Sequence, residues 1–255
     1  MDLDLEIPAG FSLVSLEERP DLIDPAGSFN GAVWPEFLFH DPYTHRYWDL
    51  LETVWREFQL VLLDPDGEIA ATNNSAPIAW DGTDDGLPAG WDDQFERSAL
   101  QRDAGVDPTT LGAIQIVVDP ARRGIGLAGV MVMAMRANAR SHGFDGVIAC
   151  VRPTDKHRYP LIPIDRYAFW TNPDGEPFDA WIRLHVRLGG RIVRGCPEAM
   201  TIPGTVSEWE TWTGLSFPGS GSYIVPFAAA PVEINREADT GLYHDPNVWV
   251  VHALA

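Results

Sequence analysis

The sequence predicts an α/β fold, built on a mixed, partly parallel β-sheet with helices on its faces. Residues 113–151 read as a strand, a glycine-rich loop, a helix and a second strand, which is the order of a parallel βαβ connection. Residues 58–72 contain two apolar runs on either side of Asp64-Pro-Asp-Gly67, whose proline and glycine suit a type I turn between antiparallel strands. A sheet that holds both units must contain strands in both directions.

The composition is that of a globular protein with one large domain or two small ones. Of the 255 residues, 45% are hydrophobic and 22% are charged, which argues against disorder and against a coiled coil. No run approaches the roughly 18 apolar residues that cross a membrane, and the acidic start lacks the basic region of a signal peptide. Cys150 and Cys196 are too few for a disulfide framework or a four-ligand zinc site. We therefore expect a cytoplasmic protein with no membrane partner and no bound metal.

The elements before residue 113 are read from their apolar spacing. We expect a short strand at 11–14, helices over 29–57 and the hairpin at 58–72. Residues 81–110 are rich in glycine and proline and read as a loop with a short helix around 91–99. A loop of that length is often functional, so we expect it to cover a site.

The loop between the strand at 113–118 and the helix at 130–140 has the chemistry of a phosphate site. Its sequence is Asp119-Pro-Ala-Arg-Arg-Gly-Ile-Gly-Leu-Ala128, so unobstructed backbone amides lie at the positive end of a helix beside two arginines. Twelve of the 18 basic residues fall between positions 122 and 194, against six acidic ones there, although the chain carries a net charge of −19. The overall charge disfavours nucleic acids, while the local charge favours an anionic ligand.

Two kinds of ligand could use this loop. Gly124–Gly129 matches the G-x-G-x-x-G dinucleotide fingerprint, with Arg152 placed to meet the 2′-phosphate of NADP. Against this interpretation, residues 119–123 separate the first glycine from the strand, and no acidic residue ends the next strand. An NADP-dependent oxidoreductase therefore stays open as an alternative.

Read from Arg123, the loop resembles the R/Q-x-x-G-x-G/A signature of the GNAT acyltransferase superfamily. The longer run Val117–Ala128 is similar, without a gap, to the family sequence V-x-P-x-x-R-x-x-G-x-G/A between the fourth strand and the third helix. The resemblance implies acetyl-CoA or another acyl-CoA as co-substrate, with its pyrophosphate on the loop amides. The CoA-binding residues that it implies are Val117, Val118, Arg122, Arg123, Gly124, Ile125, Gly126, Leu127 and Ala128.

A second resemblance lies downstream. Residues 179–190, followed by a strand at 191–193, are similar to the fourth helix and sixth strand of the family, and His185 stands where the family often has a tyrosine. That tyrosine protonates the departing CoA thiolate, so the resemblance implies His185 as the catalytic acid, a role that the ordinary near-neutral pKa of histidine permits. The alternative is a packing role for His185 on an amphipathic helix.

The resemblance covers residues 58–193 and predicts a core over 1–196, with a C-terminal extension over 197–255 packed on the same sheet. Within the extension, Thr205 and Glu208 form a capping box for a short helix, and strands are expected at 222–225 and 247–251. An insertion at 153–178 lies where such folds contact acceptors. The substrate-binding residues expected from it are Asp155, His157, Tyr159 and Tyr167.

The expected activity is transfer of an acetyl or other short acyl group from coenzyme A to an amine, by direct attack on the thioester. The acceptor is expected to be a small molecule, and the oxyanion is expected to bind a strand amide near Val117 or Val118. The superfamily also contains members that decarboxylate acyl groups or only bind CoA, so a non-catalytic acyl-CoA-binding module is a further alternative. The sequence leaves open whether two copies form a homodimer.

Overall fold

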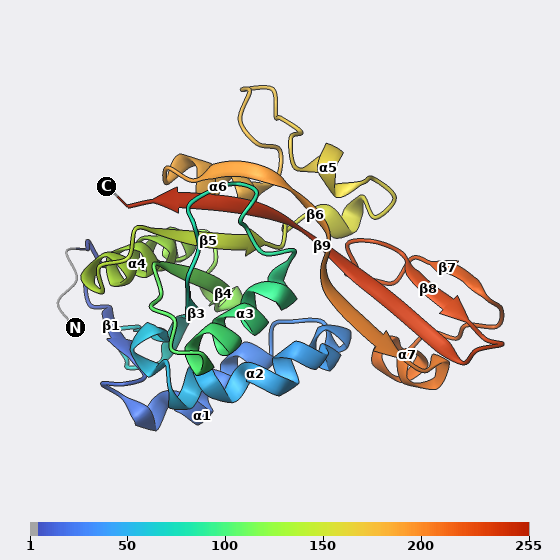
Figure 1. The fold of residues 1–255 in the computed structure, drawn as a ribbon, viewed down its shortest axis with the longest axis horizontal. Coiled ribbons are helices and arrows are strands. Elements are labelled where there is room, and N and C mark those ends of the chain that lie inside the picture. The colour runs from blue at the N-terminus through green and yellow to red at the C-terminus, as the bar shows by residue number, and fades with distance from the viewer. Residues whose placement is uncertain (1–4, 255) are drawn as a thin grey trace.

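The computed structural model describes residues 5–254, and within them one mixed sheet of nine strands organises the molecule (Figure 1). Its order is β1-β2-β3-β4-β5-β9-β8-β7, and β6 pairs with β9 beside that path. The β4–β5 pair is parallel and the other pairs are antiparallel, which confirms the predicted mixed α/β class. The strands are β1 (Ser12–Ser15), β2 (Leu60–Leu63), β3 (Ile69–Ile78), β4 (Thr110–Val118), β5 (Gly146–Val151), β6 (Arg191–Gly204), β7 (Gly221–Tyr223), β8 (Val232–Asn235) and β9 (Thr240–Ala253).

Helices cover both faces of the sheet. The alternating side chains of β2 show the division, because Leu60 and Leu62 pack against α4 while Val61 and Leu63 pack against the start of α1. None of the helices in residues 5–254 is long and apolar enough to span a membrane. The helices are α1 (Ile23–Gly31), α2 (Pro42–Thr53), α3 (Trp91–Asp103), α4 (Leu127–Ser141), α5 (Ile164–Tyr167), α6 (Ala180–Arg187) and α7 (Val206–Thr213).

The two parallel strands pair only at their beginnings. Thr110–Ala113 of β4 lies opposite Gly146–Ala149 of β5, although both strands continue beyond these residues. On its other edge β4 contains a bulge, since Ala113 and Gln115 pair with consecutive residues of β3 and leave Ile114 unmatched. The sheet is therefore split at the carboxyl ends of β4 and β5.

The last part of the chain contributes to this sheet and also builds a second core. β9 lies between β5 and β6, and β6 runs through residue 196 without interruption. At the far end of the β6–β9 ribbon lie α7, β7 and β8 (Figure 1). The rings of Trp209 and Tyr243 are buried in the core there. Gly241 is needed here, because a Cβ would lie 2.1 Å from Cδ1 of Trp209.

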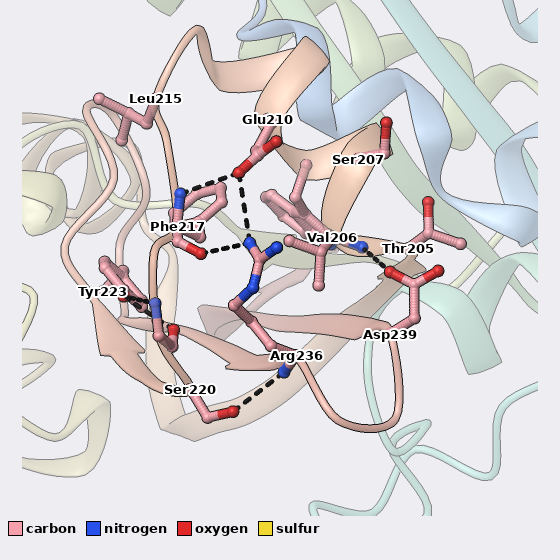
Figure 2. Close-up of polar contacts among 12 residues, drawn as sticks. Thr205, Val206, Ser207, Glu210, Leu215, Phe217, Ser220, Tyr223, Arg236 and Asp239 are labelled. Atoms are coloured by element: carbon pink, nitrogen blue, oxygen red, sulfur yellow. Dashed lines mark hydrogen bonds and ion pairs between the residues drawn. The ribbon is translucent and has the colours of Figure 1, made fainter.

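Polar contacts hold the loops of this second core (Figure 2). The Arg236 guanidinium donates to the carbonyl of Phe217 at 2.6 Å and lies 3.6 Å from the Glu210 carboxylate, which accepts from the Phe217 amide. The Asp239 carboxylate accepts from the Val206 amide at the start of α7. The predicted capping box at the same helix end is present.

The element boundaries differ from the predictions where long-range pairing decides them. α1 begins at Ile23, before the predicted helical region, and α3 is longer than the short helix expected at 91–99. β3 extends to Ile78 because β4 pairs along it, and the strand expected at 247–251 is the middle of the longer β9. β8 was not predicted at all.

Candidate active site

A cavity of about 540 Å³ runs through the split between β4 and β5. Residues 113–116 of β4 line it, together with Val147 and residues 149–151 of β5. Trp34 and α2 residues such as Trp48 line one end, and side chains of α4 and α6, including Met135 and Trp181, line the other. Because these helices lie on opposite faces of the sheet, the cavity has two approaches that meet between the strands.

The glycine loop joins β4 to α4 in the form that a phosphate group needs. Gly124 and Gly126 have φ angles of +85° and +91°, and a Cβ built on either would meet no heavy atom within 4 Å. Gly126 is the N-cap residue of α4, and no side chain of the described residues caps this helix end. The amides of the first turn are therefore open to an anion, and the loop fits the pyrophosphate of CoA.

The two loop arginines have different surroundings. The Arg122 guanidinium donates to the carboxylates of Asp64 and Asp119, which hold it against the body of the protein. Arg123 is exposed and makes no hydrogen bond or ion pair with any residue of the 5–254 range. Arg123 is thus the cation that is available to a ligand on the loop.

His185 lies on α6 at the wall of the cavity. The Asp179 carboxylate caps this helix by accepting from the amides of Trp181 and Ile182. The His185 side chain is buried, its Nδ1 lies 2.9 Å from Nε2 of His252, and the Trp181 ring packs edge-on against it at 4.4 Å. Its other nitrogen, Nε2, has no hydrogen-bond partner among the residues described.

The buried environment changes the chemistry expected of this histidine. Burial, followed by repulsion from His252, lowers the pKa of His185 to about 3. Burial, followed by the charge of Arg136, lowers the pKa of His252 to about 4. Both rings are neutral at pH 7, which corrects the expectation of a near-neutral pKa. At pH 7 His185 is therefore a neutral imidazole, and it can act as an imidazolium acid only after it has accepted a proton.

Comparison with known proteins decides the family. No family model matches the chain. The arginine N-acetyltransferase avaD of Aspergillus versicolor is 31% identical over 284 residues, covering 99% of this chain and 97% of that protein. The chain belongs to the GNAT superfamily. It is an acyl-CoA-dependent N-acyltransferase, and an acyl-CoA is its co-substrate.

Solved structures show the same fold. The loading GNATL domain of CurA from Lyngbya majuscula superposes with a TM-score of 0.59 at 16% identity, over 95% of this chain and 97% of that one. The GphF GNAT-like decarboxylase, solved with isobutyryl-CoA, gives a TM-score of 0.57 at 19% identity, over 96% and 99%. Both comparisons cover nearly the whole chain, including the C-terminal part.

The NADP interpretation of the loop is replaced by this assignment. The third glycine of the dinucleotide fingerprint packs its helix against a strand, whereas Gly129 of α4 faces Leu184 of α6. Arg152 is also paired within the protein, because its Nε donates to both oxygens of the buried Asp245 at 3.0 Å. No cation is left at that position for a 2′-phosphate.

The insertion of this GNAT enzyme packs beside α6. The Tyr167 hydroxyl is buried and donates to Asp179 at 2.9 Å, and burial raises the pKa of that hydroxyl well above its usual range. The Asp155 amide donates to the same carboxylate, His157 bonds the carbonyl of Thr154, and Tyr159 packs in a ring cluster with Tyr167. None of these four predicted acceptor residues lines the cavity, because these contacts hold them in the insertion.

Several cavity residues were missed by sequence reasoning. Asn30, Trp34, Trp48 and Asp49 come from α1, α2 and the turn between them, where the sequence indicated only helical packing. The Trp34 indole donates to Gln115 of β4 at 2.9 Å, which ties this end of the cavity to the sheet. On β4, cavity-lining residues end at Ile116, while Val117 is buried and Val118 packs with the α4 cluster. No motif marks these positions in the sequence.

Proposed function

We propose that this protein transfers an acetyl group from acetyl-CoA to the amine of a small acceptor that carries a guanidinium group, with arginine as the reference acceptor. The observation that carries the proposal is the 31% identity to an arginine N-acetyltransferase across 99% of the chain. The cavity supports it, since one end is lined by α4, the helix that follows the glycine loop, and the other end is lined by aromatic rings and a carboxylate.

The CoA approach is formed by the loop and the end of β4. The pyrophosphate would accept from the amides of residues 124–128 and pair with Arg123, while Arg122 holds the loop in place. The thioester would then reach the split between the strands. Candidates for the N–H donor to the oxyanion are Val117, Val118 and the bulged Ile114, which lines the cavity.

The acceptor approach suits a cation. Asp49 is the one carboxylate among the described residues that line the cavity, and Trp34 and Trp48 place indole rings at the same end. Glu52 lies close by, since its carboxylate accepts from the Trp48 indole at 3.0 Å, and burial raises the pKa of this carboxyl. Carboxylates and indole faces both attract a guanidinium group.

The chemistry requires one proton to move from nitrogen to sulfur. The neutral amine attacks the thioester carbon, the new C–N bond forms, and the C–S bond breaks as the tetrahedral intermediate collapses. His185 lines the cavity wall beside α4, in contact with His252, and we propose it as the residue that handles this proton.

Two measurements test the function. Melting temperatures with acetyl-CoA, NADPH and buffer distinguish the cofactors, and we expect only acetyl-CoA to stabilise the protein. Thiol release is then compared for arginine and its neutral isostere citrulline, in the wild type and in Asp49→Asn. We expect faster release with arginine and a smaller preference in the variant. Stabilisation by acetyl-CoA with no turnover for any amine would indicate a binding module instead.

A cytoplasmic location and a homodimer remain proposals about the same enzyme. Light scattering of the purified protein with and without acetyl-CoA tests the second one directly.

A further inference from the structure

A chain of side-chain amides, buried at Gln59, Asn74 and Asn30, runs from β3 to the acceptor approach of the cavity. Asn74 of β3 lies at the junction, where its Nδ2 donates to Oε1 of Gln59 at 3.0 Å. Its Oδ1 accepts from Nε2 of Gln115 at 2.9 Å and from Nδ2 of Asn30 at 3.3 Å. The chain ends at Trp34, whose indole donates to Oε1 of Gln115 at 2.9 Å. Both of these last residues line the cavity.

The backbone fixes the direction of the hydrogen bonds in this chain. A backbone N–H can only donate, and a backbone carbonyl can only accept. The Ser75 N–H lies 3.1 Å from Oε1 of Gln59, and Nε2 of Gln59 lies 2.6 Å from the carbonyl of Trp55 and 2.9 Å from that of Ser75. Gln59 therefore presents its oxygen to Asn74, which must donate with Nδ2 and accept with Oδ1. Gln115 must then donate to Asn74 and accept at its own Oε1.

The other end of the chain gives the same assignment. An indole nitrogen is only a donor, so Oε1 of Gln115 is the atom that must face Nε1 of Trp34. The Asn30 Oδ1 accepts from the Thr72 hydroxyl, which leaves its Nδ2 to donate to Asn74. Donors and acceptors thus match along the whole chain, and rotation of any one amide would set like atoms against each other.

The chain determines how the Trp34 ring meets a ligand. Trp34 lies between α1 and the turn at 36–40, outside any helix or strand, and its ring is half-buried against the second core. The indole N–H lies in the ring plane, so the bond to Gln115 constrains an edge of the ring and not a face. The Trp48 indole is held in the same way, because it donates to Glu52 at 3.0 Å. Both rings can therefore offer a ligand their faces, which attract cations, but no N–H for an anion.

We propose that Gln115 is a specificity-determining positioning residue, which holds the Trp34 indole so that its face receives the guanidinium group of the acceptor. Asn74 and Gln59 act behind it by fixing the direction of its amide. The inference rests on the proposed acyl transfer to such an acceptor. It identifies the ligand class that the two indole rings select as a planar cation, and the effect of Gln115 is on this acceptor and not on acyl-CoA.

Substitutions at Gln115 separate positioning from packing. Gln115→Met keeps the length of the side chain but bonds neither Trp34 nor Asn74, so kcat/KM should fall about 3- to 30-fold for arginine and change little for citrulline, with the Kd of acetyl-CoA unchanged. Gln115→Glu still offers an oxygen to the indole and should keep the preference for arginine. In the Trp34→Phe background, Gln115→Met should have little further effect on this preference.

The matched control is Gln101→Met. The Gln101 side chain bonds the backbone of Ala79 at 2.9 and 3.0 Å, and Gln101 is not among the described residues that line the cavity. This variant also exchanges a bonded amide for a thioether, so it should keep the parental kcat/KM for both amino acids. Unequal effects on arginine and citrulline are then specific to Gln115.

The hold on the indole can be read without any activity. In ¹⁵N–¹H spectra, the Trp34 Nε1–H signal is assigned by its loss in Trp34→Phe. This hydrogen should exchange slowly with solvent in the wild type, in Gln115→Glu and in Gln101→Met, and faster in Gln115→Met.

Three results would overturn the inference. They are fast exchange of the Trp34 indole hydrogen in the wild type, an unchanged exchange rate in a folded Gln115→Met, and an equal fall in kcat/KM for arginine and citrulline in that variant. Because the spectra need no acceptor, a failure of the proposed acyl transfer would be seen separately, as absence of amine-dependent thiol release.

Discussion

Gly126 has a left-handed backbone and faces open space, so a side chain there would stand where the pyrophosphate meets the amides. Gly126→Asp should abolish acetyl-CoA binding, through steric exclusion and charge repulsion. Gly143→Asp is the matched control, because Gly143 also has a positive φ of +75° and no atom near its Cβ position, but lies at the other end of α4. Calorimetry should show parental affinity in the control. Parental affinity in Gly126→Asp would contradict the loop assignment.

Substitutions of the two neighbouring arginines should have different effects, one on acetyl-CoA binding and the other on stability. Arg123→Ala should weaken acetyl-CoA by about 1–3 kcal/mol at low salt and flatten the salt dependence of binding, because it removes a charge-assisted contact to phosphate. Arg122→Ala should mainly lower the melting temperature, since Asp64 and Asp119 lose their partner. Titrations at several salt concentrations check both. If only Arg122→Ala changes the salt dependence of acetyl-CoA binding, then Arg122 contacts the phosphates and Arg123 does not.

The buried histidines should make the fold sensitive to acid. Their pKa values fall from 6.5 to about 3 and about 4 on folding, so the unfolded chain binds more protons below pH 6.5 and stability is lost as pH falls. Between pH 6.5 and 5 each ring should remove about 2 kcal/mol from the free energy of unfolding. Denaturant titrations of the wild type and of the double variant His185→Phe, His252→Phe measure how the free energy of unfolding changes with pH in each. If the free energy of unfolding changes equally with pH in both proteins between pH 6.5 and 5, the two histidines are not a buried neutral pair.

At the scale of elements, two buried carboxylates join α2, α3 and β6. Asp41 caps α2 by accepting from Thr44, and Asp92 of α3 accepts from the Thr201 amide of β6, while one oxygen of each has no partner in the described chain. Burial, followed by the charge of Asp41, raises the pKa of Asp92 to about 9. The Asp92 carboxyl is therefore protonated at neutral pH, and stability is lost progressively as pH rises from the ordinary value of 3.8 to about 9.

Replacing one carboxyl by an amide should remove this dependence. In Asp92→Asn the amide oxygen can still accept from Thr201 and the amide nitrogen can donate to Asp41, so stability at pH 8 should rise by about 1 kcal/mol or more. Asp93→Asn, next in the helix and paired with Arg97, serves as the control and should give no gain. Chemical denaturation at pH 6 and pH 8 provides the test. A loss of stability at pH 8 would contradict a protonated Asp92.

The elements that could be predicted are those with a local cause. The run from β4 through α4 to β5 combines glycines, a capped turn and apolar periodicity, and its boundaries lie close to the expected ones. β8 is short and is stabilised by its neighbours β7 and β9, so its four residues carry little signal of their own. The acceptor residues were sought in the insertion, where the Tyr167 hydroxyl and the Asp155 backbone amide donate to Asp179.

At the scale of the whole molecule, the active site is assembled from distant segments. The cavity joins residues near position 30 to His252, and the two histidines that meet are 67 residues apart. The return of β9 between β5 and β6 brings them together, and no local pattern encodes that pairing. The glycine loop between β4 and α4 was predictable because its ten residues, 119–128, are consecutive, whereas the cavity residues near position 30 come together only in the complete sheet.

We propose that the cavity transfers an acyl group from CoA to an amine. The most direct measurement of this transfer is the ratio of free thiol to acetylated arginine, determined by a thiol assay and mass spectrometry after incubation with acetyl-CoA and arginine. We predict equal amounts of both products in the wild type and neither in Gly126→Asp. Thiol release without acetylated amine, or no thiol release from a protein that binds acetyl-CoA, would contradict acyl transfer to the amine.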